Sequence, residues 1–255
     1  MEEIYDPIIS LIKKSDESKE QKTKLLSVNK ATEDVKQSKN KYNEEYIKLK
    51  NDYDKKYYTI MNQISDIINS KDTNILTKEE CEKYGITESK EENTTIIKDF
   101  WFTVIKNCGY FTISQEEGTL LKSLSNITLK AENDHLDFSV TFHFGNNQYF
   151  TNDTITKTYI YDESKEEVKE IKVSEIKFNK DVALSTFCTK SQFNDTRNFC
   201  EIFDEKEKDM KLNENEAKFI KNDLMVNALE YFLNIGICDS NLFNALKINQ
   251  KKLNK

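Results

Sequence analysis

The sequence has little proline, glycine and histidine, and it has no long apolar run. Its 255 residues include one proline, five glycines and two histidines. This scarcity of proline and glycine excludes collagen-like chains, flexible Gly/Ser linkers and loop-rich sandwiches, and it predicts long regular elements. No stretch approaches the roughly 18 apolar residues of a membrane span, so we expect no membrane partner. The acidic N-terminus gives no reason to expect a secretory signal.

Motifs for catalysis, metal binding and cofactor binding are also missing. His135 and His143 have no partners at metal-ligand spacing, the glycines stand singly, and no G-x-S-x-G is present. We therefore predict no enzyme, no catalytic or metal-binding residues and no cofactor. The cysteines are odd in number and form no C-x-x-C pair, which favours reduced thiols in the nucleus or cytosol. They are Cys81, Cys108, Cys188, Cys200 and Cys238.

Charged residues make up 33% of the chain and hydrophobic residues 37%, with 12 tyrosines and 15 phenylalanines. Disordered chains are poor in aromatic residues, so this composition indicates a folded core. The net charge is −7. All of it lies after residue 70, because acidic and basic residues balance before that point. This sign disfavours direct DNA recognition and weakly favours a basic partner, although mild acidity also serves solubility alone.

The clearest pattern is a long helix between Ser15 and Ser70, a stretch without proline or glycine. Ser15 or Asp16 is the expected N-cap. Apolar side chains recur with a mean spacing of about 3.5 residues, which is typical of a helix that packs along another helix. About 50 helical residues extend roughly 75 Å, more than a domain of this size covers, so we expect a second copy as partner. A bundle within the same chain is the alternative. The predicted dimerisation residues are Leu25, Val28, Val35, Tyr42, Tyr46, Leu49, Tyr53, Tyr57 and Ile60.

The remainder predicts a mixed α+β lobe. Residues 136–144 alternate between apolar and polar side chains, as in a strand with one packed and one solvated face. Together with strands near 127–130, 155–161 and 169–178 it gives an antiparallel meander of about four strands. Helices are expected over 96–107, 115–124 and 214–235, with a helical turn near 78–83 and a short amphipathic helix around residues 4–12.

Three segments resemble the nucleosome assembly protein family, which includes the SET proteins. The run 99–107, DFWFTVIKN, is similar to the family's F-W-L-T-x-x-x-N helix. The sequence FHF at 142–144, followed by YFTNDTITKTY at 149–159, resembles its F-x-F…F-F-T-N-x-x-L-x-K-T-Y strand pair. Lys55-Lys56-Tyr57-Tyr58 lies near the end of the long helix, as in the family's dimerisation helix. The proline before the F-W pair and the strongly acidic tail of many members are absent.

The resemblance implies a histone chaperone that assembles nucleosomes without catalysis. Such a protein is a homodimer joined by its long helices, and it binds core histones on a concave acidic surface in the nucleus and cytoplasm. It also implies a helical dimerisation segment over 1–70, a histone-binding lobe over 71–240 and a C-terminal tail over 241–255. Matched by position, the candidate histone-binding residues are Glu116, Glu117, Glu201, Asp204, Glu205, Glu207, Asp209, Glu214 and Glu216. The alternative is a dimeric coiled-coil scaffold for a non-histone protein, and preference for basic cargo separates the two.

Overall fold

The computed structural model describes residues 7–70, 75–86, 97–133, 136–188, 197–204, 206 and 209–235. The chain divides into two compact units, Met1–Lys50 and Asn51–Lys255. The predicted organisation into a helical segment, a lobe and a tail stays a prediction, and the tail lies outside the described residues.

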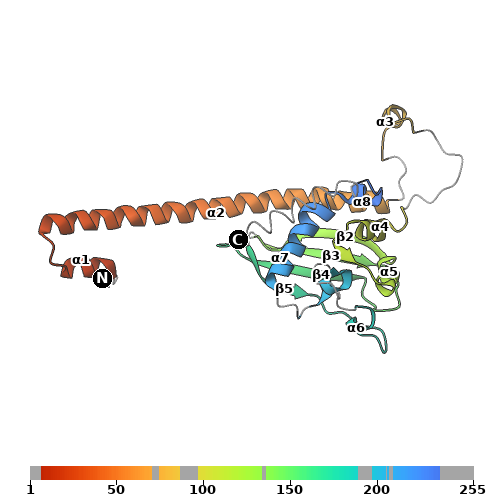
Figure 1. The fold of residues 1–255 in the computed structure, drawn as a ribbon. Coiled ribbons are helices and arrows are strands. Elements are labelled where there is room, and N and C mark those ends of the chain that lie inside the picture. Colours follow the sequence, from red (N-terminus) through yellow and green to blue (C-terminus); the bar gives the residue numbers. More distant parts are fainter. Residues whose placement is uncertain are drawn as a thin grey trace. The chain divides into compact units, whose positions relative to one another are not determined.

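The predicted long helix is present as α2, Lys19–Asn69, and follows the short helix α1, Pro7–Lys14 (Figure 1). The N-cap differs from the prediction. The Ser18 hydroxyl accepts a hydrogen bond from the Gln21 N–H at 3.2 Å, and the Gln21 side chain accepts one from the Ser18 N–H at 2.8 Å. This reciprocal S-x-x-Q pairing is a capping box, which satisfies two backbone donors, whereas Ser15 or Asp16 as N-cap would lack it.

A four-stranded antiparallel sheet forms the centre of the second unit, and the α+β prediction is confirmed. Its order is β2-β3-β4-β5 (Figure 1). The strands are β2 Leu124–Ala131, β3 Phe138–Phe144, β4 Thr154–Asp162 and β5 Glu167–Val173. β5 ends earlier than predicted, although Phe178 still forms an isolated bridge with Phe150. A second, parallel pair joins β1 Phe111–Thr112 to β6 Arg197–Asn198.

The outer edge of β2 is covered by polar side chains of α2. The Asn62 side chain accepts from the Leu129 N–H at 2.9 Å and donates to the Leu129 carbonyl at 2.8 Å. The Ser65 hydroxyl donates to the Ile127 carbonyl, and Asn69 donates to the Ser125 carbonyl. An uncovered strand edge invites pairing with other chains, so these side chains both attach the helix and close the sheet.

Short helices complete the lobe. They are α3 Lys78–Lys83, α4 Phe100–Asn107, α5 Gln115–Leu121, α6 Leu184–Phe187, the 3-10 helix η1 Phe199–Phe203, α7 Met210–Phe219, the π-helical η2 Ile220–Leu224 and α8 Ala228–Phe232. α7 lies across the sheet (Figure 1). The single helix predicted over 214–235 is therefore divided into three segments. α4 begins at Phe100 rather than at residue 96, because Asp99 before it takes a left-handed conformation.

The packed face of β3 is as predicted, since Phe138, Val140, Phe142 and Phe144 are buried. The opposite face is less solvated than predicted, because Ser139 is also buried and His143 is half-buried. Burial lowers the pKa of His143, and the Thr128 hydroxyl lies 2.9 Å from its Nε2. No helix among the described residues has the length and apolar character needed to cross a membrane.

Candidate functional site

Three of the nine acidic candidates are buried, and so they do not present a carboxylate to a partner. Glu216 and Glu117 are fully buried, and Glu214 is 4% exposed. For these three, assignment to a binding surface is wrong. The physical reason is the same in each case, because donors or cations of the same chain already occupy the carboxylate.

Glu216 of α7 lies at the centre of a buried network of charges. Its Oε1 is 2.6 Å from Lys157 Nζ of β4 and accepts a hydrogen bond of 2.5 Å from the Tyr159 hydroxyl. Its Oε2 is paired with the Arg197 guanidinium of β6. All four side chains are at most 4% exposed. Buried charges persist only when they are paired and hydrogen-bonded, and this network meets that condition.

Residues of the network also form hydrogen bonds and an ion pair with neighbouring residues. Lys157 Nζ donates to Asn213 Oδ1 at 2.9 Å, and Arg197 Nη2 donates to the Glu201 carbonyl at 2.6 Å. The Glu201 carboxylate is 3.7 Å from Arg197 Nε, which leaves this half-buried candidate partly neutralised. Burial and the adjacent Glu216 raise the pKa of Tyr159 well above its ordinary value. The network joins the sheet, β6 and α7, so its role is structural.

Sequence reasoning missed this network, although one signal was available. Ile155, Lys157 and Tyr159 alternate along β4 and therefore share one face of the sheet. A lysine between two residues on a packed face needs a buried acidic partner. The only arginine of the chain supplies the second cation.

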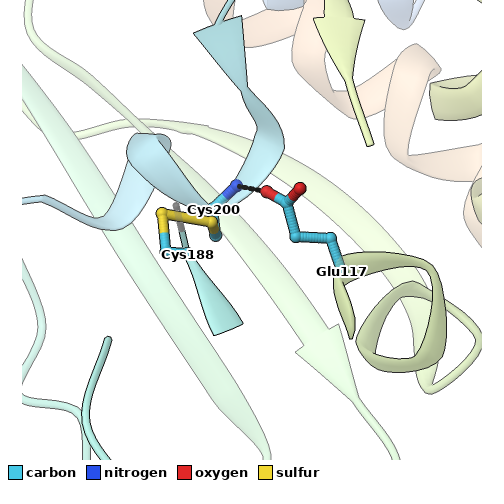
Figure 2. Close-up of side chains that lie close together, drawn as sticks. All are labelled: Glu117, Cys188 and Cys200. Carbon is cyan, nitrogen blue, oxygen red and sulfur yellow. Dashed lines mark hydrogen bonds between the residues drawn. A yellow bond between two sulfur atoms is a disulfide. The ribbon is translucent and has the colours of Figure 1, made fainter. Parts of the chain in front are cut away.

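The Glu117 side chain caps the N-terminus of α5 and also accepts a hydrogen bond from η1. Its Oε2 accepts from the Ser114 N–H at 2.8 Å, while the Ser114 hydroxyl accepts from the Glu117 N–H. Its Oε1 accepts from the Cys200 N–H at 2.9 Å (Figure 2). Burial raises the pKa of the Glu117 carboxyl, although the hydrogen bonds from Cys200 and Ser114 oppose that shift.

We expect the Glu117→Gln variant to remove a specific pH dependence of stability. Because the pKa of Glu117 is raised in the folded state, the folded chain binds more protons than the unfolded chain between the ordinary and the raised pKa. The free energy of unfolding therefore falls as pH rises through that window. Urea unfolding of both proteins over a pH series checks this. A difference between the two proteins that does not change with pH would contradict it.

The prediction that the cysteines are reduced thiols is wrong for one pair. Cys188, just after α6, and Cys200 of η1 form a disulfide (Figure 2). Cys81 and Cys108 are free, and burial raises the pKa of the Cys108 thiol to about 11. The two bonded cysteines are 12 positions apart. Since the tertiary fold, rather than a local motif, brings them together, their spacing could not reveal the bond.

The remaining acidic candidates differ in exposure. Glu116 and Asp209 are exposed, and Asp204 is half-exposed. Asp209 also caps α7 by accepting from the Leu212 N–H at 3.0 Å. Glu214, one of the three buried candidates, pairs with Lys218 and Lys211, and the Lys218 ammonium helps to lower its pKa against the effect of burial. Glu205 and Glu207 lie outside the described residues.

Most of the predicted dimerisation residues form an uncovered apolar stripe along α2, which we call the α2 stripe. Its exposed fractions reach 71% at Leu49 and 63% at Tyr53. Its members are Leu25, Val28, Val35, Tyr42, Tyr46, Leu49, Tyr53 and Ile60. Tyr57 is different, because it is half-buried against its own lobe and its hydroxyl donates to the Lys221 carbonyl at 3.0 Å. It therefore does not belong to the stripe.

The family description "Nucleosome assembly protein (NAP)" matches residues 23–209, which is more than half of the chain. The chain belongs to the nucleosome assembly protein family. The resemblance seen in the sequence is thereby confirmed, and the matched region includes most of α2 and most of the lobe. The family match thus covers the α2 stripe and, of the buried network, Lys157, Tyr159 and Arg197, while Glu216 lies beyond the matched residues.

Relatives agree with this membership, and a solved structure agrees with the fold. Human nucleosome assembly protein 1-like 2 is 39% identical over 83 residues, 31% of this chain and 18% of the relative. Xenopus laevis nucleosome assembly protein 1-like 1-A is 31% identical over 122 residues, 39% of this chain and 31% of the relative. The chain thus matches less than a third of the length of these two relatives. The structure of nucleosome assembly protein 1 from Plasmodium knowlesi has a TM-score of 0.59 at 21% identity, covering 87% of this chain and 100% of that one. At this identity the likeness supports the fold alone.

Proposed function

We propose that this protein is a histone chaperone that binds core histones as a homodimer and promotes nucleosome assembly without catalysis. The observation that carries the proposal is the family match over residues 23–209, which includes most of the long helix and most of the lobe. The net charge of −7 suits a basic cargo. We place the activity in the nucleus and cytoplasm, with no direct recognition of DNA sequence.

The α2 stripe supports the homodimer. Exposed apolar side chains at a spacing of 3.5 residues are costly in water unless another helix covers them. A second copy of the chain offers the same stripe, and a twofold contact between identical surfaces is the commonest way to close an oligomer. We therefore assign the α2 stripe to the dimer contact.

For histone binding we retain the candidates that are neither buried nor paired with a buried cation. These are Glu116, Asp204 and Asp209, with Glu205 and Glu207 from outside the described residues. Dispersed exposed carboxylates attract a basic protein over a range of about 10 Å at moderate salt, and each contributes little. Such binding is strong in sum and still reversible, as a carrier of histones requires.

The scaffold alternative gains from the burial of Glu117, Glu214 and Glu216, because it leaves fewer acidic side chains for a basic cargo. A dimeric scaffold for a non-histone protein would keep the α2 stripe and the fold. It would bind without preference for basic cargo, and its binding would change little with salt.

Reversing four of the retained charges should weaken histone binding at least tenfold while the oligomeric state stays unchanged. We choose Glu116, Asp204, Glu205 and Glu207, each changed to Lys, and leave Asp209 because it caps α7. Fluorescence titration of labelled core histones at several salt concentrations measures the affinity. The variant should also show a smaller dependence of affinity on salt.

A matched variant carries the same four reversals at exposed positions elsewhere, namely Glu79, Glu167, Glu170 and Glu175. It should bind histones more tightly than the first variant. Equal loss in both would mean that net charge alone attracts histones and that the chosen residues form no site. Absence of histone binding by the unmodified chain would favour the scaffold.

A further inference from the structure

Three ligand-type side chains converge where α5, η1 and the end of α6 meet. Glu117, Cys188 and Cys200 each place a sulfur or a carboxylate oxygen within 4.8 Å of the others (Figure 2). Glu117 and Cys200 are fully buried, and Cys188 is half-buried. They come from three separate elements, so the fold rather than a local motif creates the cluster.

Once the disulfide is reduced, these side chains match the ligand preferences of a zinc-like cation. Two thiolates and one carboxylate form a three-ligand set that leaves a fourth position for water. With Zn–S distances of about 2.3 Å, two sulfurs of a tetrahedral site lie about 3.8 Å apart. The Cα atoms of the two cysteines are 5.5 Å apart, so their side chains reach that separation through rotation about their own bonds.

Glu117 is already oriented for this role. Its two carboxylate oxygens each accept one backbone hydrogen bond, from Ser114 and from Cys200, and each retains a second lone pair. Carboxylate ligands of metals are commonly held by hydrogen bonds of this kind. Among the described residues no ion pair joins Glu117 to a lysine, arginine or histidine, so a bound cation would compensate a buried carboxylate. Cys188, the half-buried member, leaves a side open to solvent.

We propose that reduced Cys188 and Cys200, together with Glu117, bind a thiophilic divalent cation of the zinc class, and that the disulfide excludes it. A dithiol reductant supplies two electrons that break the S–S bond, giving two cysteine thiols while the reductant forms its own disulfide. The cation then replaces both thiol protons, which pass to solvent. Bonded sulfurs cannot act as thiolate ligands, so the disulfide and the bound cation are alternative states of one pair.

Either state therefore joins the end of α6 to η1. The disulfide connects the end of α6 to η1, and a cation held by three ligands would add α5 to that connection. The site concerns a cation, so its existence does not depend on whether the protein binds histones.

Cobalt(II) titration of the full chain tests the proposal, because thiolate-bound cobalt absorbs strongly in the near ultraviolet. The chain is reduced with a dithiol, desalted without oxygen and titrated beside an oxidised sample. We expect one Co²⁺ per chain with thiolate absorption in the reduced sample, displacement by Zn²⁺, and no such absorption in the oxidised one. Loss of the absorption in Cys188→Ser and Cys200→Ser, and affinity lower by about tenfold or more in Glu117→Gln, are also expected.

The matched control is Cys81→Ser, which changes a free cysteine outside the cluster and should leave the titration unchanged. Circular dichroism establishes that each variant is folded, and the half-buried Cys188 decides the result if Cys200→Ser does not fold. A reduced chain without thiolate absorption would overturn the proposal. So would absorption that survives in Cys188→Ser.

Discussion

Glu216→Ala should lower the free energy of unfolding by about 3–5 kcal/mol, a large part of the stability of a typical domain. The change removes the carboxylate that pairs with both Lys157 and Arg197 and leaves these two cations buried beside each other. The Tyr159 hydroxyl also loses its acceptor. Urea unfolding followed by circular dichroism and by tryptophan fluorescence measures the loss.

A surface change provides the comparison. Glu170→Ala removes a carboxylate that is 53% exposed and 3.7 Å from Lys172 Nζ. Exposed pairs of this kind contribute about 0–1 kcal/mol, so this variant should unfold almost as the unmodified chain does. A Glu216→Ala loss as small as that of Glu170→Ala would mean that the network is hydrated rather than sealed in the core.

Replacing Leu49 and Tyr53 together with Glu should convert the proposed dimer to monomers, and the dissociation constant of the dimer should rise by more than a hundredfold. Both side chains are exposed in the single chain, so the change costs little within one copy. In a helix pair the same positions would place four carboxylates in an apolar contact, where each uncompensated charge costs several kcal/mol. Light-scattering mass after size exclusion, over a range of concentrations, measures the change.

Gln37→Glu with Asn40→Glu is the matched control. It adds two carboxylates within one helical turn, on exposed positions of α2 that face away from the stripe. This variant should keep the mass of two chains. Dimers in both variants would place the contact elsewhere on the molecule, and monomers in both would make it a general effect of charge on the helix.

Sequence patterns predicted the helices and strands that are determined by residues close together in the chain. The alternation in 136–144 is produced by a sheet packed on one face, and β3 accordingly buries Phe138, Val140, Phe142 and Phe144. The repeat of the α2 stripe predicted a long helix to within four residues at its start and one at its end. The strand-pair motif at 149–159 predicted the family, which is now established.

Features that depend on distant residues escaped prediction. The acidic residues between 201 and 216 looked like a binding surface, yet α7 turns Glu216 toward Lys157 and Arg197 of other elements. The pattern over 214–235 also did not reveal the π-helical η2, which changes the helical spacing between α7 and α8. The disulfide between Cys188 and Cys200 depends on tertiary contacts alone.

In the first unit of the chain, residues 7–50 have little tertiary packing to stabilise them. Between residues 7 and 50 no side chain is buried, although α2 runs through most of that stretch. A helix without tertiary packing is marginal in water, so this half of α2 gains most of its stability from whatever covers its apolar stripe. If a second copy does so, helix content depends on protein concentration, and dilution melts the N-terminal half before the lobe unfolds.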